Sequence, residues 1–293
     1  MVGNRKKLKN GVILILPAFL FISAFMIYPM FNVLYLSFHE YSPLRSTEVS
    51  FIGWGNYLWM AESDIVSHSL YITILFTIIS VAIEMVVGLL IATLLAKFTI
   101  VVRSKVGKIL NKIFIGIFLL PFAAPTIAAA IAWKMLLHPQ FGPVNDILGV
   151  EVAWFTKYPL LSIIFADAWK MTPFMLLLFF AAIMSIEPEQ FEAAKVDGVN
   201  SWQEFRYLTL PSILPVLAVA TAFRAVDAFT KIFDMVYMTT GGGPGNATEV
   251  LPLLIWKTAF SHLNFGKASA LAVVAILISA LLGIILVIKR RSA

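Results

Sequence analysis

Six long stretches of almost wholly apolar sequence decide what this chain can fold into. They run over 11–36, 69–96, 113–137, 160–186, 212–238 and 268–288. A helix that crosses a bilayer needs roughly 20 predominantly apolar residues, so each stretch is long enough to span it. Hydrophobic residues make up 60% of the 293-residue chain and charged residues only 13%, too few charges for a soluble enzyme or a disordered chain. The sequence therefore predicts an all-α integral membrane protein with six transmembrane helices.

The uneven distribution of lysine and arginine predicts the orientation of these spans. The two tails and the even-numbered connections carry 14 basic residues, whereas the other side of the membrane carries 4. The 14 are Arg5, Lys6, Lys7, Lys9, Lys97, Arg103, Lys105, Lys108, Lys112, Lys195, Arg206, Lys289, Arg290 and Arg291. We therefore expect both termini to be cytoplasmic, which requires an even number of spans and agrees with six.

Neither of two glycine-containing segments matches a nucleotide-binding motif. Gly266-Lys267-Ala268 lacks the Ser or Thr that follows the lysine of a phosphate-binding loop, and the run 241–245 is not followed by Lys-Ser or Lys-Thr. The chain has no cysteine, and its four histidines lack the i, i+4 spacing of a helical zinc site. We expect no catalytic residue, no metal site and no cofactor bound by this chain.

The loop 187–211, predicted to be cytoplasmic, has the local chemistry of two short helices joined at a glycine. Pro188 suits the first position of a helix, and Gly198 lies where a helix end needs a left-handed residue. The run 201–204 fits a capping box that opens a second helix, and Pro211 then marks the entry to the fifth span. On these residues alone, an ordinary interfacial link between two spans is as good an interpretation as a docking element.

This loop resembles the signature of ABC-importer permeases that depend on a solute-binding protein. The signature is Glu-Ala-Ala, three residues, Gly, nine residues, and an aliphatic-x-Leu-Pro ending. Its elements are present as Glu192, Ala193, Ala194, Gly198, Leu208, Leu210 and Pro211. The one departure is Leu208, where Ile is commoner. The resemblance implies the type I ABC-importer permease fold, with 187–211 as a cytoplasmic helix–Gly–helix coupling loop.

Further segments are similar to the carbohydrate branch of that family, which includes maltose, lactose, other oligosaccharide and glycerol-3-phosphate permeases. They are Leu16-Pro17-Ala18, Tyr28-Pro29, 141–145, 237–245 and 265–270. The resemblance covers nearly the whole chain. It implies a single transmembrane domain over 1–293, with a first span at 11–38 and a permease core at 69–288 that contains the loop 187–211.

What the resemblance implies is one subunit of a larger importer in the cell membrane. A second, homologous permease would complete a pathway for a carbohydrate, and a di- or oligosaccharide is the expected substrate in this branch. An extracytoplasmic solute-binding protein would deliver the substrate, and no nucleic acid is expected. Two cytoplasmic ATPase subunits would bind ATP and Mg²⁺ and receive the coupling loop. The implied coupling residues are Glu192, Ala193, Ala194, Asp197, Gly198, Leu208, Leu210 and Pro211.

Charged residues in the predicted fifth span share one helical face. At 100° per residue, four of them fall within an arc of roughly 80°; they are Arg224, Asp227, Lys231 and Asp234. Charges within a span are costly and face the bundle interior or water. This face could line the substrate pathway, together with Asp167, Lys170 and Tyr237, or it could form a structural ladder of ion pairs. For Glu84, in the second span, a structural polar contact is favoured.

Two other classes of function compete with the importer permease. A secondary transporter driven by an ion gradient would need no ATPase, and the complete Glu-Ala-Ala loop disfavours it. A membrane-embedded enzyme, such as a lipid-modifying transferase, is disfavoured because the sequence carries no catalytic constellation.

We predict that both tails and the loop 187–211 are cytoplasmic. Single cysteines at Ser50, Asn145 and Asn246 should then react with an impermeant thiol reagent in intact cells, because these positions fall in the outer connections. The natural chain has no cysteine that would interfere. Protection of all three positions would overturn this topology.

Overall fold

A computed structural model describes residues 15–101 and 104–288 of the chain, and these contain six helices long and apolar enough to cross a membrane. They are Ile15–Ser37, Asp64–Ile100, Lys105–Ala123, Pro159–Met184, Ser201–Lys231 and Phe265–Ile284. The predicted number of spans is confirmed. Several basic residues used to predict the orientation lie outside the described residues, namely Arg5, Lys6, Lys7, Lys9, Arg103, Lys289, Arg290 and Arg291.

The described residues divide into two compact units. The first comprises 15–66 and 254–276, and the second comprises 67–101, 104–253 and 277–288. In order along the chain, the helices and strands of the first unit are α2 (Tyr28–Ser37), β1 (His39–Ser42), β2 (Ser46–Phe51), α3 (Gly55–Glu62) and the beginning of α15 (Phe265–Ile288).

The two strands of the first unit are an exception to the all-α prediction. They pair antiparallel, with His39 opposite Phe51. Asn56, on α3, is buried beside the hairpin, and its side-chain amide donates to the backbone carbonyls of Ser37 and His39 at 2.9 Å each. These two bonds hold the start of the hairpin, which periodicity alone did not predict because its strands are short and polar.

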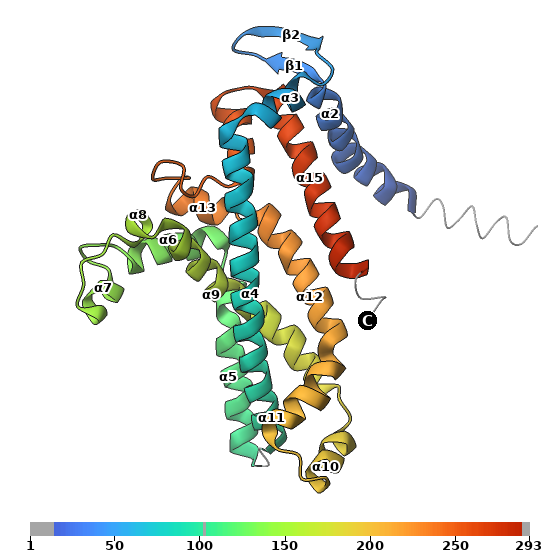
Figure 1. Cartoon of the computed structure of the whole chain (residues 1–293), viewed down its shortest axis with the longest axis vertical. Helices are drawn as coiled ribbons and strands as arrows, with labels where there is room; N and C mark the ends of the chain where they lie inside the picture. Colours follow the sequence, from blue (N-terminus) through green and yellow to red (C-terminus); the bar gives the residue numbers. More distant parts are fainter. Residues whose placement is uncertain (1–14, 102–103, 289–293) are drawn as a thin grey trace, which may run out of the picture. The chain divides into compact units, whose positions relative to one another are not determined.

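The second unit is built on α4 (Asp64–Val101), α9 and the helices that pack on them (Figure 1). The helix α9 contacts both α5 and α12. The remaining elements are α5 (Lys105–Ala123), α6 (Thr126–Leu136), α7 (Pro143–Leu148), α8 (Trp154–Lys157), α9 (Pro159–Met184), α10 (Pro188–Val196), α11 (Ser201–Gln203), α12 (Leu210–Lys231), α13 (Phe233–Thr239) and α14 (Leu251–Trp256), the last of which crosses the boundary between the units.

The third span lies nearer the N-terminus than predicted. It ends at Ala123, after which Ala124 is extended (φ −69°, ψ 136°) and Pro125 precedes the separate helix α6. A proline pushes the residue before it out of the helical conformation and cannot donate an N–H itself. The predicted span 113–137 therefore combined parts of two helices. Lys105 and Lys112, assigned above to a connection, lie within α5.

The fifth span begins and ends earlier than the predicted 212–238. Helical structure is continuous from Ser201 to Lys231 and includes a π-helical segment, Glu204–Thr209. Pro211 thus lies within a long helix and does not mark its entry. The helix stops at Ile232 (φ −66°, ψ −11°), and α13 follows as a separate helix.

The connection between α6 and α9 is organised around Asn145. Its buried amide nitrogen donates to the carbonyls of His138, Pro139 and Val152 at 3.0–3.3 Å, and its Oδ1 accepts from the indole of Trp154 at 2.6 Å. A cysteine at Asn145 would remove these bonds and be shielded from a reagent. Ile147, which is 83% exposed, is the better labelling position in this connection.

We predict that Gly266→Ala destabilises the first unit, because a Cβ at this position would overlap the backbone carbonyl of His39 and crowd the backbone nitrogen of Tyr41. Overpacking of this kind costs about 1–3 kcal/mol, which thermal unfolding of the detergent-solubilised protein should detect. Gly116→Ala is the control, since nothing lies within 4 Å of a Cβ there. Equal unfolding temperatures for the two variants would contradict the prediction.

Candidate functional site

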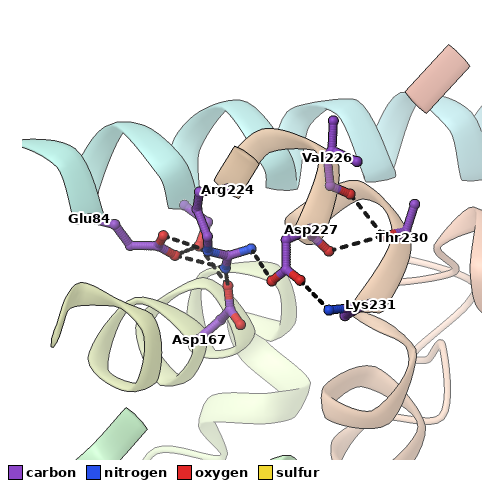
Figure 2. A network of polar contacts seen from close by, with 8 residues as sticks. Glu84, Asp167, Arg224, Val226, Asp227, Thr230 and Lys231 are labelled. Atoms are coloured by element: carbon purple, nitrogen blue, oxygen red, sulfur yellow. Dashed lines mark hydrogen bonds and ion pairs between the residues drawn. The ribbon is translucent and has the colours of Figure 1, made fainter. Parts of the chain in front are cut away.

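A cluster of charged side chains joins α4, α9 and α12 inside the second unit (Figure 2). Arg224, only 2% exposed, lies at its centre. The guanidinium Nε donates to Glu84 Oε2 at 2.7 Å, and Nη2 donates to Glu84 Oε1 at 2.9 Å. Nη2 also donates to Asp167 Oδ2. One arginine from α12 thus ties together carboxylates from two other helices.

The cluster continues along α12 towards its exposed end. Nη1 of Arg224 lies 3.4 Å from Asp227 Oδ2, and the other oxygen of Asp227 lies 2.7 Å from Nζ of Lys231. These contacts follow from the i, i+3 and i, i+4 spacings, which bring side chains to one face of a helix. The side chain of Lys231 is 75% exposed, so the cluster runs from a buried end to an accessible one.

Ser80 completes the buried end, and the sequence did not single it out. It lies one turn before Glu84 on α4, and its hydroxyl is 2.8 Å from Glu84 Oε1 and 2.9 Å from Asp167 Oδ2. A hydroxyl carries one proton, so it can donate to only one of these carboxylates at a time. The i, i+4 spacing of Ser80 and Glu84 was the available signal. The structural contact predicted for Glu84 is confirmed by its bidentate pair with Arg224.

An open cavity of about 410 Å³ lies beside the cluster. Its charged lining comes from α9 and α12, and its apolar lining includes four phenylalanine rings. It also lies where two helices are interrupted, because Phe122 and Thr126 flank the break between α5 and α6, and Ile232 follows α12. The charged residues that line it are Asp167, Lys170, Arg224, Asp227 and Lys231. The aromatic lining had no signal in the sequence.

Two residues proposed from sequence for the substrate pathway lie outside the cavity lining. Asp234 and Tyr237 belong to α13, beyond the end of α12, and neither lines the cavity. The ring of Tyr237 stacks on Phe233 with centroids 5.2 Å apart. The prediction that Asp234 continues the face of Arg224 is wrong, because the helix does not continue through Ile232.

The loop that follows α9 begins with α10 and ends that helix in a Schellman motif. Gly198 has φ +71°, as predicted for a helix-terminating glycine. Its N–H donates to the carbonyl of Lys195 at 3.1 Å, and the N–H of Val199 donates to that of Ala194 at 3.0 Å. These are the two bonds that define the motif, and they satisfy carbonyls that a helix end otherwise leaves unpaired.

The capping box of the next helix starts one residue earlier than predicted. Asn200, not Ser201, is the N-cap, and its Oδ1 accepts from the backbone N–H groups of Trp202 and Gln203 at 3.0 and 2.9 Å. The side chain of Gln203 accepts in return from the N–H of Asn200. The helix so capped is not short, since it runs on without interruption into α12.

The coupling residues predicted from sequence divide by exposure. On α10 and at its end, Glu192, Ala193, Asp197 and Gly198 are exposed, and Ala194 is partly buried. In the following helix Leu208 and Leu210 are partly buried and Pro211 is exposed. A salt bridge of 3.6 Å between Lys97 and Glu204 ties this helix to the end of α4. The end of α10 is therefore exposed, while the helix that follows it is tied to α4 by the salt bridge.

The family model described as "Binding-protein-dependent transport system inner membrane component" matches residues 88–291. The trehalose/maltose transport system permease protein MalF of Thermococcus litoralis is 34% identical over 89% of this chain and 85% of that protein. The sulfoquinovosyl glycerol transport system permease protein SmoG of Agrobacterium fabrum is likewise 34% identical, over 90% of this chain and 84% of that protein.

Solved structures confirm the fold class. A chain of a bacterial ABC transporter involved in the import of the acidic polysaccharide alginate matches with a TM-score of 0.84 at 21% identity, covering 99% of this chain and 98% of that one. A chain of the alginate transporter in complex with a periplasmic protein that holds an alginate pentasaccharide matches with a TM-score of 0.81, over 98% and 95% of the two chains. The architecture is that of type I ABC-importer permeases.

We predict that Arg224→Met destabilises the protein by about 3–5 kcal/mol, because Glu84 and Asp167 would be left buried without a cation. Lys231→Met should cost about 1 kcal/mol or less, since the lysine side chain is 75% exposed and Asp227 keeps its contact with Arg224. Thermal unfolding in detergent measures both. Adding Glu84→Gln to Arg224→Met should recover part of the loss. A mild effect of Arg224→Met would mean that the cluster does not hold the helices together.

Proposed function

We propose that this chain, which belongs to the family of inner-membrane components of binding-protein-dependent transport systems, forms half of the translocation pathway of an ATP-driven carbohydrate importer. The observation that carries the proposal is the exposed end of α10, which bears the Glu-Ala-Ala sequence and closes in a left-handed glycine. The carbohydrate class is supported by two relatives, whose names assign them to transport of trehalose or maltose and of a sulfoquinovosyl glycerol.

The ATPase site of the importer lies on other subunits. Two cytoplasmic ATPases bind ATP and Mg²⁺ and receive Glu192, Ala193, Asp197 and Gly198 in a surface cleft. A second, homologous permease completes the pathway, and an extracytoplasmic solute-binding protein delivers the carbohydrate. Both termini of this chain are cytoplasmic, so the loop 187–211 lies on the ATPase side.

The continuous helix from Ser201 to Lys231 is the element that transmits motion. Arg224 is 23 residues beyond Ser201, which corresponds to roughly 35 Å at 1.5 Å per residue. This helix begins within the coupling loop 187–211, and its far end carries Arg224, Asp227 and Lys231 beside the cavity. A displacement of α10 by a closing ATPase pair is therefore delivered to the walls of the cavity.

The cavity is the substrate pathway in this proposal. Lys170, Asp227 and Lys231 offer donors and acceptors for sugar hydroxyls, while the phenylalanine rings offer apolar faces. Small-molecule sites are built in this way, with a mainly apolar lining and a few polar groups that fix orientation. Asp167 and Arg224 serve both roles, since they line the cavity and hold the helices together.

We predict that Gly198→Val inserts normally but loses stable binding of the ATPase. A β-carbon at φ +71° is strained by about 1 kcal/mol or more, and a larger side chain would collide with a cleft fitted to the turn. Glu192→Lys, on the same loop, should have the same effect in milder form. Co-purification of the ATPase with the permease pair, and ATP hydrolysis stimulated by the binding protein, are the measurements.

Gly149→Val is the matched control for this experiment. Gly149 also ends a helix at positive φ (+64°) with nothing within 4 Å of a Cβ, but it lies in the outer connection after α7. It should carry a similar backbone strain and keep the ATPase. If Gly198→Val left both co-purification of the ATPase and stimulated ATP hydrolysis at wild-type levels, this loop would not be the coupling element. Uptake that persists without ATP and follows an ion gradient would favour a secondary transporter instead.

A further inference from the structure

Lys170 is the least satisfied charge in the cavity. Its residue is 7% exposed, and its ammonium group makes one long hydrogen bond, 3.4 Å to the backbone carbonyl of Phe122. Within the described residues, no carboxylate oxygen lies within 4.0 Å of its Nζ. An ammonium carries three donors, and buried donors without acceptors are costly. Two of the three N–H groups of Lys170 thus lack an acceptor from the described protein.

The other cations that line the cavity already have carboxylate partners. Arg224 pairs with Glu84, Asp167 and Asp227, and Lys231 pairs with Asp227. The lining itself holds three cations and two carboxylates, because Glu84 is not among the lining residues. With Glu84, which pairs with Arg224, the cluster holds three cations and three carboxylates, so what distinguishes Lys170 is that, among the described residues, it alone of these cations has no carboxylate oxygen within 4.0 Å.

Three of the phenylalanine rings that line the cavity form a row that ends beside Lys170. The ring of Phe122 packs on that of Phe174 with centroids 5.9 Å apart at 29°, and Phe174 packs on Phe223 at 5.5 Å and 36°. Nζ of Lys170 is 5.7 Å from the centroid of the Phe122 ring. A row of apolar faces thus ends at a buried cation that has no carboxylate oxygen within 4.0 Å among the described residues.

From this arrangement we infer that the cavity takes a carbohydrate that carries an anionic group, and that Lys170 binds that group. The inference rests on the proposed function and narrows its substrate class. The sugar ring lies against the phenylalanine row, and the anionic group supplies the acceptors that Lys170 lacks. Asp167 is bonded to Arg224, and Asp227 is bonded to Arg224 and Lys231, so the N–H groups left to bind an anionic group are those of Lys170.

The first test measures the charge preference of the cavity in the assembled importer, with partner subunits free of cysteine. Thr126→Cys places one thiol in the lining, and its reaction rates with an anionic and a cationic methanethiosulfonate reagent are compared. The exposed Ile147→Cys is the reference. Relative to that reference, the ratio of anionic to cationic rate should be high and should fall about tenfold with Lys170→Met, the factor that 1.4 kcal/mol of free energy gives.

Two further variants serve as controls for this measurement. Lys170→Arg keeps the charge and should keep the ratio. Lys134→Met is the matched control, because Lys134 also donates to one backbone carbonyl, that of Met238 at 3.5 Å, but does not line the cavity. If Lys170→Met fails to fold, the Thr126→Cys variant that keeps Lys170 still tests the inference. Equal rates with the anionic and cationic reagents in that variant would overturn it. An equal fall with Lys134→Met also overturns it.

The second test asks whether binding requires both the sugar ring and the anionic group of the ligand. Glucuronate, glucose and acetate are compared at equal concentration as protectants of Thr126→Cys. Glucuronate should slow labelling more than either of the others, and Lys170→Met should abolish that difference. Equal protection by glucose and glucuronate, equal protection by acetate, or no protection at all would each overturn the inference. Co-purification of the ATPase tests the proposed function separately, so an importer that assembles without this preference contradicts only the substrate class.

Discussion

The packing of the second unit depends on one arginine that three carboxylates surround. Arg224 is buried, and removing a charge from water costs several kcal/mol unless close partners and hydrogen bonds offset the loss. The bidentate contact with Glu84 and the contact with Asp167 set the register of α12 against α4 and α9. Because these partners come from different helices, no one of the three can slide or rotate without exposing an unpaired charge.

The cavity exists because two helices are interrupted beside this cluster. The second halves of the interrupted helices, α6 and α13, pack on each other, while α5 and α12 both pack on α9. The break at Ala124 and Pro125 leaves the last carbonyls of α5 without helical partners, and Lys170 reaches one of them. The charged and the interrupted parts of the fold therefore form one site.

The sequence predicted what depends on local pattern. The six apolar stretches, the left-handed Gly198 and the shared face of Arg224 and Asp227 all follow from spacing or from the needs of a single residue. The helix breaks do not. Pro121, Pro173 and Pro215 lie inside helices, whereas Pro125 follows a break, so a proline in an apolar run does not by itself locate one. Arg224, which pairs with Glu84, and the aromatic lining of the cavity come from distant segments, so their placement required the fold.

The separation of Glu84 and Arg224 along the chain has a consequence for biosynthesis. They are 140 residues apart, and Glu84 is made first. At a synthesis rate of 5–20 residues per second, roughly 7–30 s pass between the translation of Glu84 and that of Arg224. An ionised carboxylate alone in hydrocarbon is too costly, so the nascent second span enters the bilayer as a neutral acid or stays in a wet environment beside the insertion machinery. The bond that completes the fold can therefore form only after the fifth span has been translated.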